Sequence, residues 1–261
     1  MQNPTTDSEL NALLDEFVTG IQPILGENFI AAYLQGSFGV GDWDTDSDVD
    51  FLVAIEHELT DADLPALQAL HSKIFNGPSA WAQHLEGSYF PRDVLKHGDP
   101  AKTKLLYLDN CHEQLVLSDH DNSLVVRWVV REHGIALAGP DAKNLIDPIP
   151  AEALRAEVLA VMQDWAKEIV AGRWQMNNRW AQPFAVLSYC RMLHTLETGR
   201  IESKLAGARW AKNALDPHWT DLIQRTWEDR PNPSLKVRQA AATNDIEDTL
   251  SFIEYALGLI N

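Results

Sequence analysis

The sequence has few cysteines, few basic residues and no long apolar run, and each scarcity excludes a class of protein. Its 261 residues include two cysteines, which are too few for a disulfide framework and lack metal-ligand spacing. Twenty-one basic residues stand against 38 acidic ones, a net charge of −17, so we expect no nucleic-acid partner. No apolar stretch is long enough to span a membrane, and residues 1–17 lack the pattern of a signal peptide. We therefore expect a cytoplasmic protein without membrane contact, and a monomer.

The hydrophobic content of 45% and the nine tryptophans are sufficient for a packed core. Residues 10–25 follow a cap signal at residues 7–9 and have helical periodicity. The short apolar runs at 28–36, 48–55 and 84–90 predict strands, residues 60–75 predict a helix, and residues 123–137 are compatible with either.

A composition change near residue 150 predicts a domain boundary. Residues 138–152 contain three prolines, and the patterns beyond them are helical, with Gly199 as one helix stop. We expect an α+β protein. Residues 1–150 would form a domain with a mixed β-sheet flanked by helices, and residues 151–261 an α-helical bundle.

Five aspartates alternate immediately before an apolar segment: Asp42, Asp44, Asp46, Asp48 and Asp50. No register of this stretch has the glycine and the glutamate that an EF-hand loop requires, which excludes that calcium site. The first three are typical of a solvated loop. The last two fall within the predicted strand and would project from the same face. At about 4 Å they would repel by about 4 kcal/mol, so they require a cation or a raised pKa.

Gly36 and Ser37 follow the preceding apolar run, where a tight turn can direct backbone N–H groups and a hydroxyl toward an anion. A phosphate-binding turn beside a carboxylate pair that holds magnesium is what phosphoryl or nucleotidyl transfer requires.

The stretch GSFGVGDWDTDSDVDFLV resembles the Gly-Ser, then Asp-x-Asp signature of the polymerase-β-type nucleotidyltransferase superfamily. Residues 127–150 and 186–211 are similar to the aminoglycoside adenylyltransferases that modify streptomycin and spectinomycin. The resemblance implies a nucleotidyltransferase domain followed by a helical bundle. It also implies ATP as co-substrate, Mg²⁺, and transfer of AMP to a hydroxyl with release of pyrophosphate.

The resemblance also assigns roles in the first domain. Gly36 and Ser37 match the phosphate-contacting turn, Asp48 and Asp50 the metal ligands, and Glu86 the general base. A carboxylate can take the proton of the attacking hydroxyl. From the residues alone, a surface strand residue is the favoured interpretation of Glu86.

In the second domain, Arg191 and Lys204 match basic residues that contact the ATP phosphates. An ion pair on a helix face and a residue in a first helical turn are the alternatives. Trp180 is either an aromatic wall for the acceptor or a core residue. The segment before the central helix departs from streptomycin-modifying relatives, because the uncharged residues Asn177, Asn178 and Gln182 occur where carboxylates are expected, so streptomycin as a substrate stays open.

The expected activity is adenylyl transfer to a hydroxyl of an aminoglycoside or a related cationic small molecule, since an acidic cleft attracts a cation. Two alternatives stay open: a protein-modifying or antitoxin-type nucleotidyltransferase, and a nucleotide-binding module without catalysis.

Overall fold

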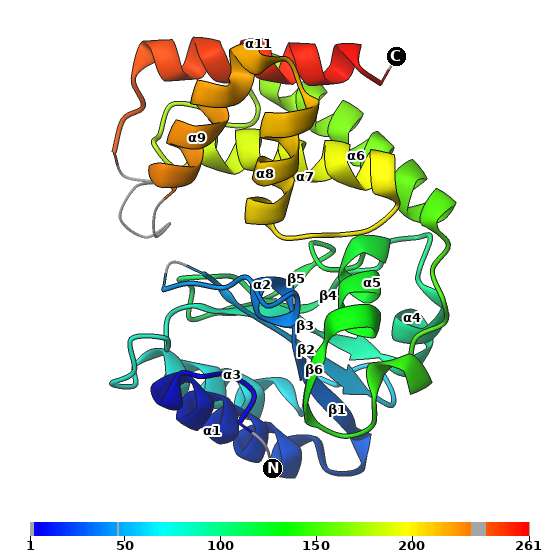
Figure 1. Cartoon of the computed structure of the whole chain (residues 1–261). Coiled ribbons are helices and arrows are strands. Elements are labelled where there is room, and N and C mark those ends of the chain that lie inside the picture. Colours follow the sequence, from blue (N-terminus) through cyan, green and yellow to red (C-terminus); the bar gives the residue numbers. More distant parts are fainter. Residues whose placement is uncertain (1–2, 46, 231–238, 261) are drawn as a thin grey trace. The chain divides into compact units, whose positions relative to one another are not determined.

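A computed structural model describes residues 3–45, 47–230 and 239–260 (Figure 1). The chain divides into two compact units, Met1–Pro148 and Ile149–Asn261. The first unit contains a mixed β-sheet and several helices. The second is helical over its described residues, apart from an isolated bridge between Asn178 and Ala240. The fold is α+β, as the sequence predicted.

The sheet of the first unit has six strands in the order β5-β4-β3-β2-β1-β6. Neighbouring strands are antiparallel, except that β2 and β3 are parallel. The strands are β1 (Phe29–Leu34), β2 (Val49–Ile55), β3 (Leu85–Pro91), β4 (Leu105–Leu108), β5 (Leu115–Ser118) and β6 (Ile135–Ala138). The three strands predicted from the apolar runs are therefore confirmed, and three shorter ones lie beside them.

The helices of the first unit are α1 (Ser8–Leu25), α2 (Gly36–Gly39), α3 (Leu64–Phe75), α4 (Arg92–His97) and α5 (Leu124–His133). Helix α1 begins at Ser8, within the predicted cap signal, because the carboxylate of Asp7 accepts a hydrogen bond from the backbone N–H of Leu10 at 2.9 Å. Helix α3 begins later than predicted. The side chain of Asp63 closes a turn by accepting hydrogen bonds from Thr60, and the helix follows it.

The ambiguous segment 123–137 contains both predicted elements. Ser123 caps α5 by accepting a hydrogen bond from Val126 N, and the helix ends at Gly134. Strand β6 follows at once and pairs with β1, with Ile135 opposite Leu34. Two short elements in succession explain why neither periodicity dominated.

Helices α1 and α3 cover one face of the sheet (Figure 1). Alternate residues of β2, among them Phe51 and Val53, enter this core, and the rings of Phe17 and Phe51 lie 4.7 Å apart. Burial of one such side chain contributes about 1.5–3 kcal/mol to stability. The other alternate residues of β2, including Asp50, therefore point toward the opposite face.

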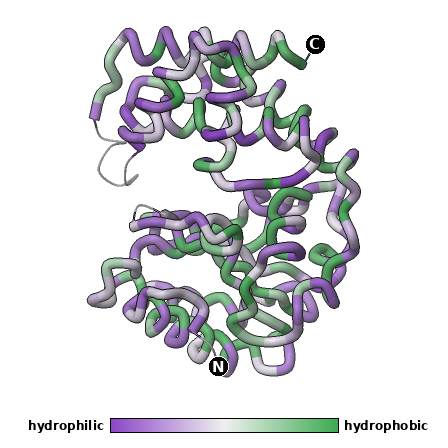
Figure 2. Tube along the Cα trace, viewed as in Figure 1, coloured by the Kyte–Doolittle hydropathy of each residue, from purple (hydrophilic) through white to green (hydrophobic). Residues whose placement is uncertain are grey.

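The helices of the second unit are α6 (Ala151–Val170), α7 (Ala181–Thr198), α8 (Lys204–Ala214), α9 (Thr220–Glu228) and α11 (Thr243–Gly258). Hydrophobic and hydrophilic residues alternate along them, as in helices with one buried face (Figure 2). Helix α7 ends at Gly199, whose φ of +70° is left-handed. Over the described residues, no helix combines the length and apolar composition that crossing a membrane requires.

Candidate active site

The turn after β1 packs directly against Asp50. The backbone N–H of Gln35 donates to the carbonyl oxygen of Asp50 at 2.8 Å, which ties the turn to β2. Gly36 has a φ of +58°, and a Cβ added there would lie 1.9 Å from Asp50 Oδ2. Both the conformation and the close approach require glycine at this position.

Ser37 follows in the short helix α2, and its hydroxyl is oriented inward. Its Oγ is buried and has no hydrogen-bond partner within the described ranges. A buried polar atom without a partner destabilises a fold unless a ligand or water satisfies it. The hydroxyl is therefore suited to donate a hydrogen bond to a bound anion beside Asp50.

Asp48 lies one residue before β2, so the expectation that it belongs to the strand was wrong. The ladder starts at Val49, whose N–H donates to His84 O at 2.8 Å. The preceding residues form a turn in which Ser47 Oγ accepts from Asp44 N at 2.9 Å. Asp46, which we expected in a solvated loop, lies outside the described residues.

Asp50 and Glu86 form a register pair across the parallel strands β2 and β3. Paired residues project from the same face of a sheet, so both carboxylates lie on the face opposite α1 and α3. The charges of Asp50 and Asp48 both act on Glu86. The structure thus brings together Gly36, Asp48, Asp50 and Glu86 from three separate segments.

The Glu86 carboxyl is largely enclosed, with 16% of its side chain exposed. Burial, and then the negative charges of Asp50 and Asp48, raise the pKa of Glu86 well above its ordinary value. A divalent cation held by those two aspartates would remove the second cause. Glu86 can therefore exchange a proton nearer to neutral pH than an exposed glutamate can.

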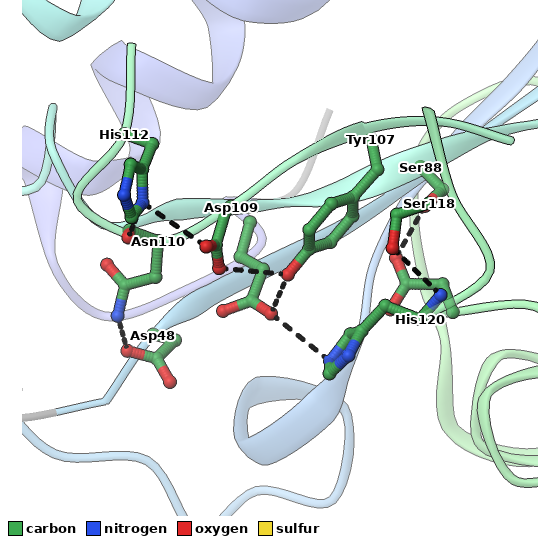
Figure 3. A network of polar contacts seen from close by, with 10 residues as sticks. Asp48, Ser88, Tyr107, Asp109, Asn110, His112, Ser118 and His120 are labelled. Carbon is green, nitrogen blue, oxygen red and sulfur yellow. Dashed lines mark hydrogen bonds and ion pairs between the residues drawn. The ribbon is translucent and has the colours of Figure 1, made fainter. Parts of the chain in front are cut away.

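Strand β4 and the turn after it contribute side chains beside these carboxylates, and Figure 3 shows Asn110 of that turn beside Asp48. Tyr107 Oη lies 2.6 Å from Glu86 Oε1 and 3.1 Å from Asp109 Oδ1. Asn110 Nδ2 donates to Asp48 Oδ1. None of these contacts was foreseen, although two four-residue apolar runs separated by a polar turn are a hairpin signal.

A second buried carboxylate, that of Asp121, contacts β3 at Ser88. Ser88 Oγ donates to Asp121 Oδ2 at 2.8 Å, and burial raises the pKa of Asp121. His120 lies beside it, with Nε2 3.6 Å from Glu86 Oε1 (Figure 3). These residues extend the acidic face of the sheet beyond the predicted site.

The donor set beside Gly36 fits magnesium bound together with phosphates. Asp48 and Asp50 offer carboxylate oxygens, and Mg²⁺ takes one or two protein carboxylates, waters and substrate phosphates rather than a complete protein cage. Accordingly, within the described part of the chain no three His, Cys, Asp or Glu residues form a ready metal site.

The predicted residues of the second unit lie on adjacent helices. A Cβ added at Gly207 of α8 would lie 2.8 Å from Arg191 Cα in α7, so the two helices approach closely there. Lys204, the first residue of α8, places Nζ 4.9 Å from the ring centroid of Phe184. Trp180 stacks on the same ring at 4.4 Å and is half-buried. Arg191 and Lys204 therefore share one helix pair.

The uncharged segment before α7 is held by its own side chains. Asn178 Oδ1 accepts hydrogen bonds from the N–H groups of Trp180 and Ala181, where α7 begins. Gln182 is buried and donates to Met176 O. Two of the residues in place of the expected carboxylates thus stabilise the local backbone.

Comparison with known proteins agrees with this architecture. The family described as aminoglycoside adenylyltransferase, C-terminal domain, matches residues 144–252. An aminoglycoside (3'') (9) adenylyltransferase of Shigella flexneri is 26% identical over 226 residues, 83% of each chain. A spectinomycin 9-adenylyltransferase of Staphylococcus aureus is 28% identical over 216 residues, 78% of each chain. The chain is thus similar to aminoglycoside adenylyltransferases over most of its length.

One solved structure shares the fold of this chain. The spectinomycin adenyltransferase AAD(9) from Enterococcus faecialis, whose structure contains ATP and spectinomycin, aligns with a TM-score of 0.69 at 17% identity. The alignment covers 95% of this chain and 98% of that one. Both units of the chain therefore have counterparts in the fold of that structure.

Proposed function

We propose that this protein transfers AMP from ATP to a hydroxyl of a cationic small molecule, such as an aminoglycoside or aminocyclitol, and releases pyrophosphate. The observation that carries the proposal is the pairing of Asp50 with Glu86 beside Gly36. It puts potential metal ligands, a potential base and an anion-binding turn within one small region. The relatives named for adenylyl transfer support the reaction type.

The triphosphate binds, in this proposal, at the turn after β1. Gly36 lets the backbone approach closely, and Ser37 Oγ donates a hydrogen bond to a phosphate oxygen. Asp48 and Asp50 hold Mg²⁺, which when bound neutralises and orients the phosphates. Asn110 keeps the Asp48 carboxylate oriented through its amide.

Glu86 acts as the general base. Its carboxylate takes the proton of the acceptor hydroxyl as that oxygen forms a bond to the α-phosphorus. The bond between the α-phosphorus and the bridging oxygen breaks, and pyrophosphate leaves with its electron pair. The raised pKa of Glu86 makes it a stronger base than an exposed glutamate.

Charge is distributed unevenly between the two units, and this favours a cationic acceptor. Residues 1–148 contain 24 of the 38 acidic residues and 8 of the 21 basic ones, whereas residues 149–261 contain 14 and 13. An acidic surface around Glu86 raises the local concentration of a cation. The same surface repels ATP, so Arg191 and Lys204 supply the positive charge for its phosphates.

Trp180 is proposed as an aromatic contact of the acceptor, because it is half-buried and its ring stacks on Phe184. A planar aromatic surface suits a sugar ring or a cation. Asn178 and Gln182 contribute no negative charge nearby, so an acceptor that does not depend on carboxylates in this segment is favoured.

The test is pyrophosphate release from ATP and Mg²⁺ with a panel of aminoglycosides and aminocyclitols. Mass spectrometry should find AMP on the acceptor. Asp50→Asn is the negative control, and Asp61→Asn, which removes an exposed charge from the same unit, is the matched positive control. Labelled AMP on a protein instead of a drug would replace the proposal with a protein-modifying activity.

A further inference from the structure

Tyr107 is buried in β4 directly beside the strand that carries Glu86. It is 5% exposed, and it pairs in register with Ser88, two residues beyond Glu86. The ring therefore lies on the same face of the sheet as the Glu86 carboxylate. Its hydroxyl reaches Glu86 Oε1 at 2.6 Å.

The hydroxyl has a single hydrogen and two carboxylates within reach. Glu86 is the nearer acceptor, at 2.6 Å against 3.1 Å for Asp109. Asp109 is half-exposed to water and also contacts His112 at 3.2 Å, so it has other donors. Glu86 is enclosed, and an enclosed carboxylate loses more when a donor is absent. The hydrogen of Tyr107 therefore belongs to Glu86.

The contacts of Glu86 are unevenly divided between its two oxygens. Oε1 accepts the hydrogen bond of Tyr107 and also faces His120 at 3.6 Å. Among the described residues, no hydrogen bond or ion pair is found at Oε2. One oxygen is thus anchored to the sheet, and the other remains available to a substrate.

We propose that Tyr107 is a positioning residue for the proposed reaction: it anchors Oε1 of Glu86 so that Oε2 receives the proton of the acceptor hydroxyl. This inference rests on the proposed function. A glutamate side chain has several rotatable bonds, and a donor fixed in a neighbouring strand removes much of that freedom. A base held in one orientation meets the acceptor oxygen in every bound complex.

Tyr107→Phe removes the hydroxyl and retains the buried ring. We expect kcat to fall roughly 10- to 100-fold, with the KM values for ATP and acceptor nearly unchanged. Tyr33→Phe is the matched control. Tyr33 is a buried residue of β1, and its hydroxyl donates to the carbonyl oxygen of Pro140 at 2.7 Å instead of to Glu86. The control should keep the native kcat. A native kcat for Tyr107→Phe, or an equal loss in both variants, overturns the proposal.

A double-mutant cycle separates positioning from general loss of structure. In a Glu86→Gln background the base is absent, so adding Tyr107→Phe should change the residual rate less than about twofold. If Tyr107→Phe slows the Glu86→Gln enzyme as much as it slows the native enzyme, Tyr107 does not act through Glu86.

A crystal structure of Tyr107→Phe supplies a readout that does not depend on turnover. The Glu86 carboxylate should adopt more than one orientation there, and a single one in the native protein and in Tyr33→Phe. A single native-like orientation in Tyr107→Phe overturns the proposal, even where AMP transfer by the native protein is established. Absence of AMP transfer by the native protein would instead reject the proposed function, while the crystal structure still decides whether Tyr107 anchors Glu86.

Discussion

Asp50 and Glu86 face each other across the parallel strands β2 and β3, with both side chains on the face of the sheet away from α1 and α3. Without a bound cation, two carboxylates in this arrangement repel each other, and burial strengthens the repulsion. Burial of the carboxyl, and then this repulsion, raise the pKa of Glu86. The proposed metal binding and proton transfer would therefore both be coupled to stability through this residue pair.

Asp50→Asn and Asp48→Asn should each abolish AMP transfer, because each removes one of two proposed magnesium ligands. Mg²⁺ should raise the unfolding temperature of the native protein and of Asp61→Asn, since a ligand that binds the folded state stabilises it. The two site variants should lose this shift. A native Mg²⁺-dependent shift in Asp50→Asn, measured by differential scanning fluorimetry, would reject the metal assignment.

Glu86→Gln should bind ATP normally and transfer AMP roughly 10²- to 10⁴-fold more slowly, because the base is absent. Isothermal titration with a non-hydrolysable ATP analogue and single-turnover kinetics check the two parts separately. Glu58→Gln, at an exposed position, is the control. Transfer at the native rate by Glu86→Gln would end the base assignment.

Glu86→Gln should also stabilise the metal-free protein at neutral pH. The folded state binds the Glu86 proton more tightly than the unfolded chain, whose pKa is near 4.5. The free energy of unfolding therefore falls as pH rises from that value through the raised pKa. Glu86→Gln lacks this loss, so its unfolding temperature in EDTA should exceed that of the native protein at pH 8 and approach it at pH 4. Equal unfolding temperatures at pH 8 would contradict the raised pKa.

Lys204→Ala should raise the KM for ATP about tenfold or more and leave the Mg²⁺-dependent stabilisation intact, because a charge-assisted contact to phosphate is lost. Arg191→Ala should behave in the same way. Arg209→Ala removes an exposed positive charge from the same helix α8 and serves as the control. If all three variants have the same KM, the phosphate contacts lie elsewhere.

His71 makes the first unit sensitive to acid. It lies on the buried face of α3, with Nε2 2.8 Å from Tyr89 Oη, and burial lowers its pKa from 6.5 to about 4. The unfolded chain takes up this proton first, so stability should fall by about 3 kcal/mol as pH drops from 6.5 to 4. The double variant His71→Leu, Tyr89→Phe removes both polar groups and should flatten this part of the stability profile, as measured by urea denaturation. An unchanged profile would assign the acid sensitivity to other groups.

The sequence was sufficient for the central strands, because β1 is a continuous apolar run and β2 and β3 contain several branched or aromatic residues. It was insufficient for β4 and β5, whose four residues each are too few for periodicity to identify. Tyr107 and Asn110 were missed for a different reason. Their contacts with Glu86 and Asp48 join residues that are 21 and 62 positions apart in the sequence. Local sequence patterns carry no information about such pairings. The start of β2 at Val49 was missed likewise, because it depends on the hydrogen bond from Val49 N–H to His84 O.

The register of β2 against β3 determines whether Asp50 and Glu86 lie side by side. Sliding one strand past its neighbour by a single position would set Glu86 against Val49 or Phe51 and turn its side chain to the opposite side of the sheet. A misaligned molecule would then force a carboxylate into the aromatic interior, which is strongly disfavoured. The carboxylate of Glu86 thus also disfavours a shifted register between β2 and β3.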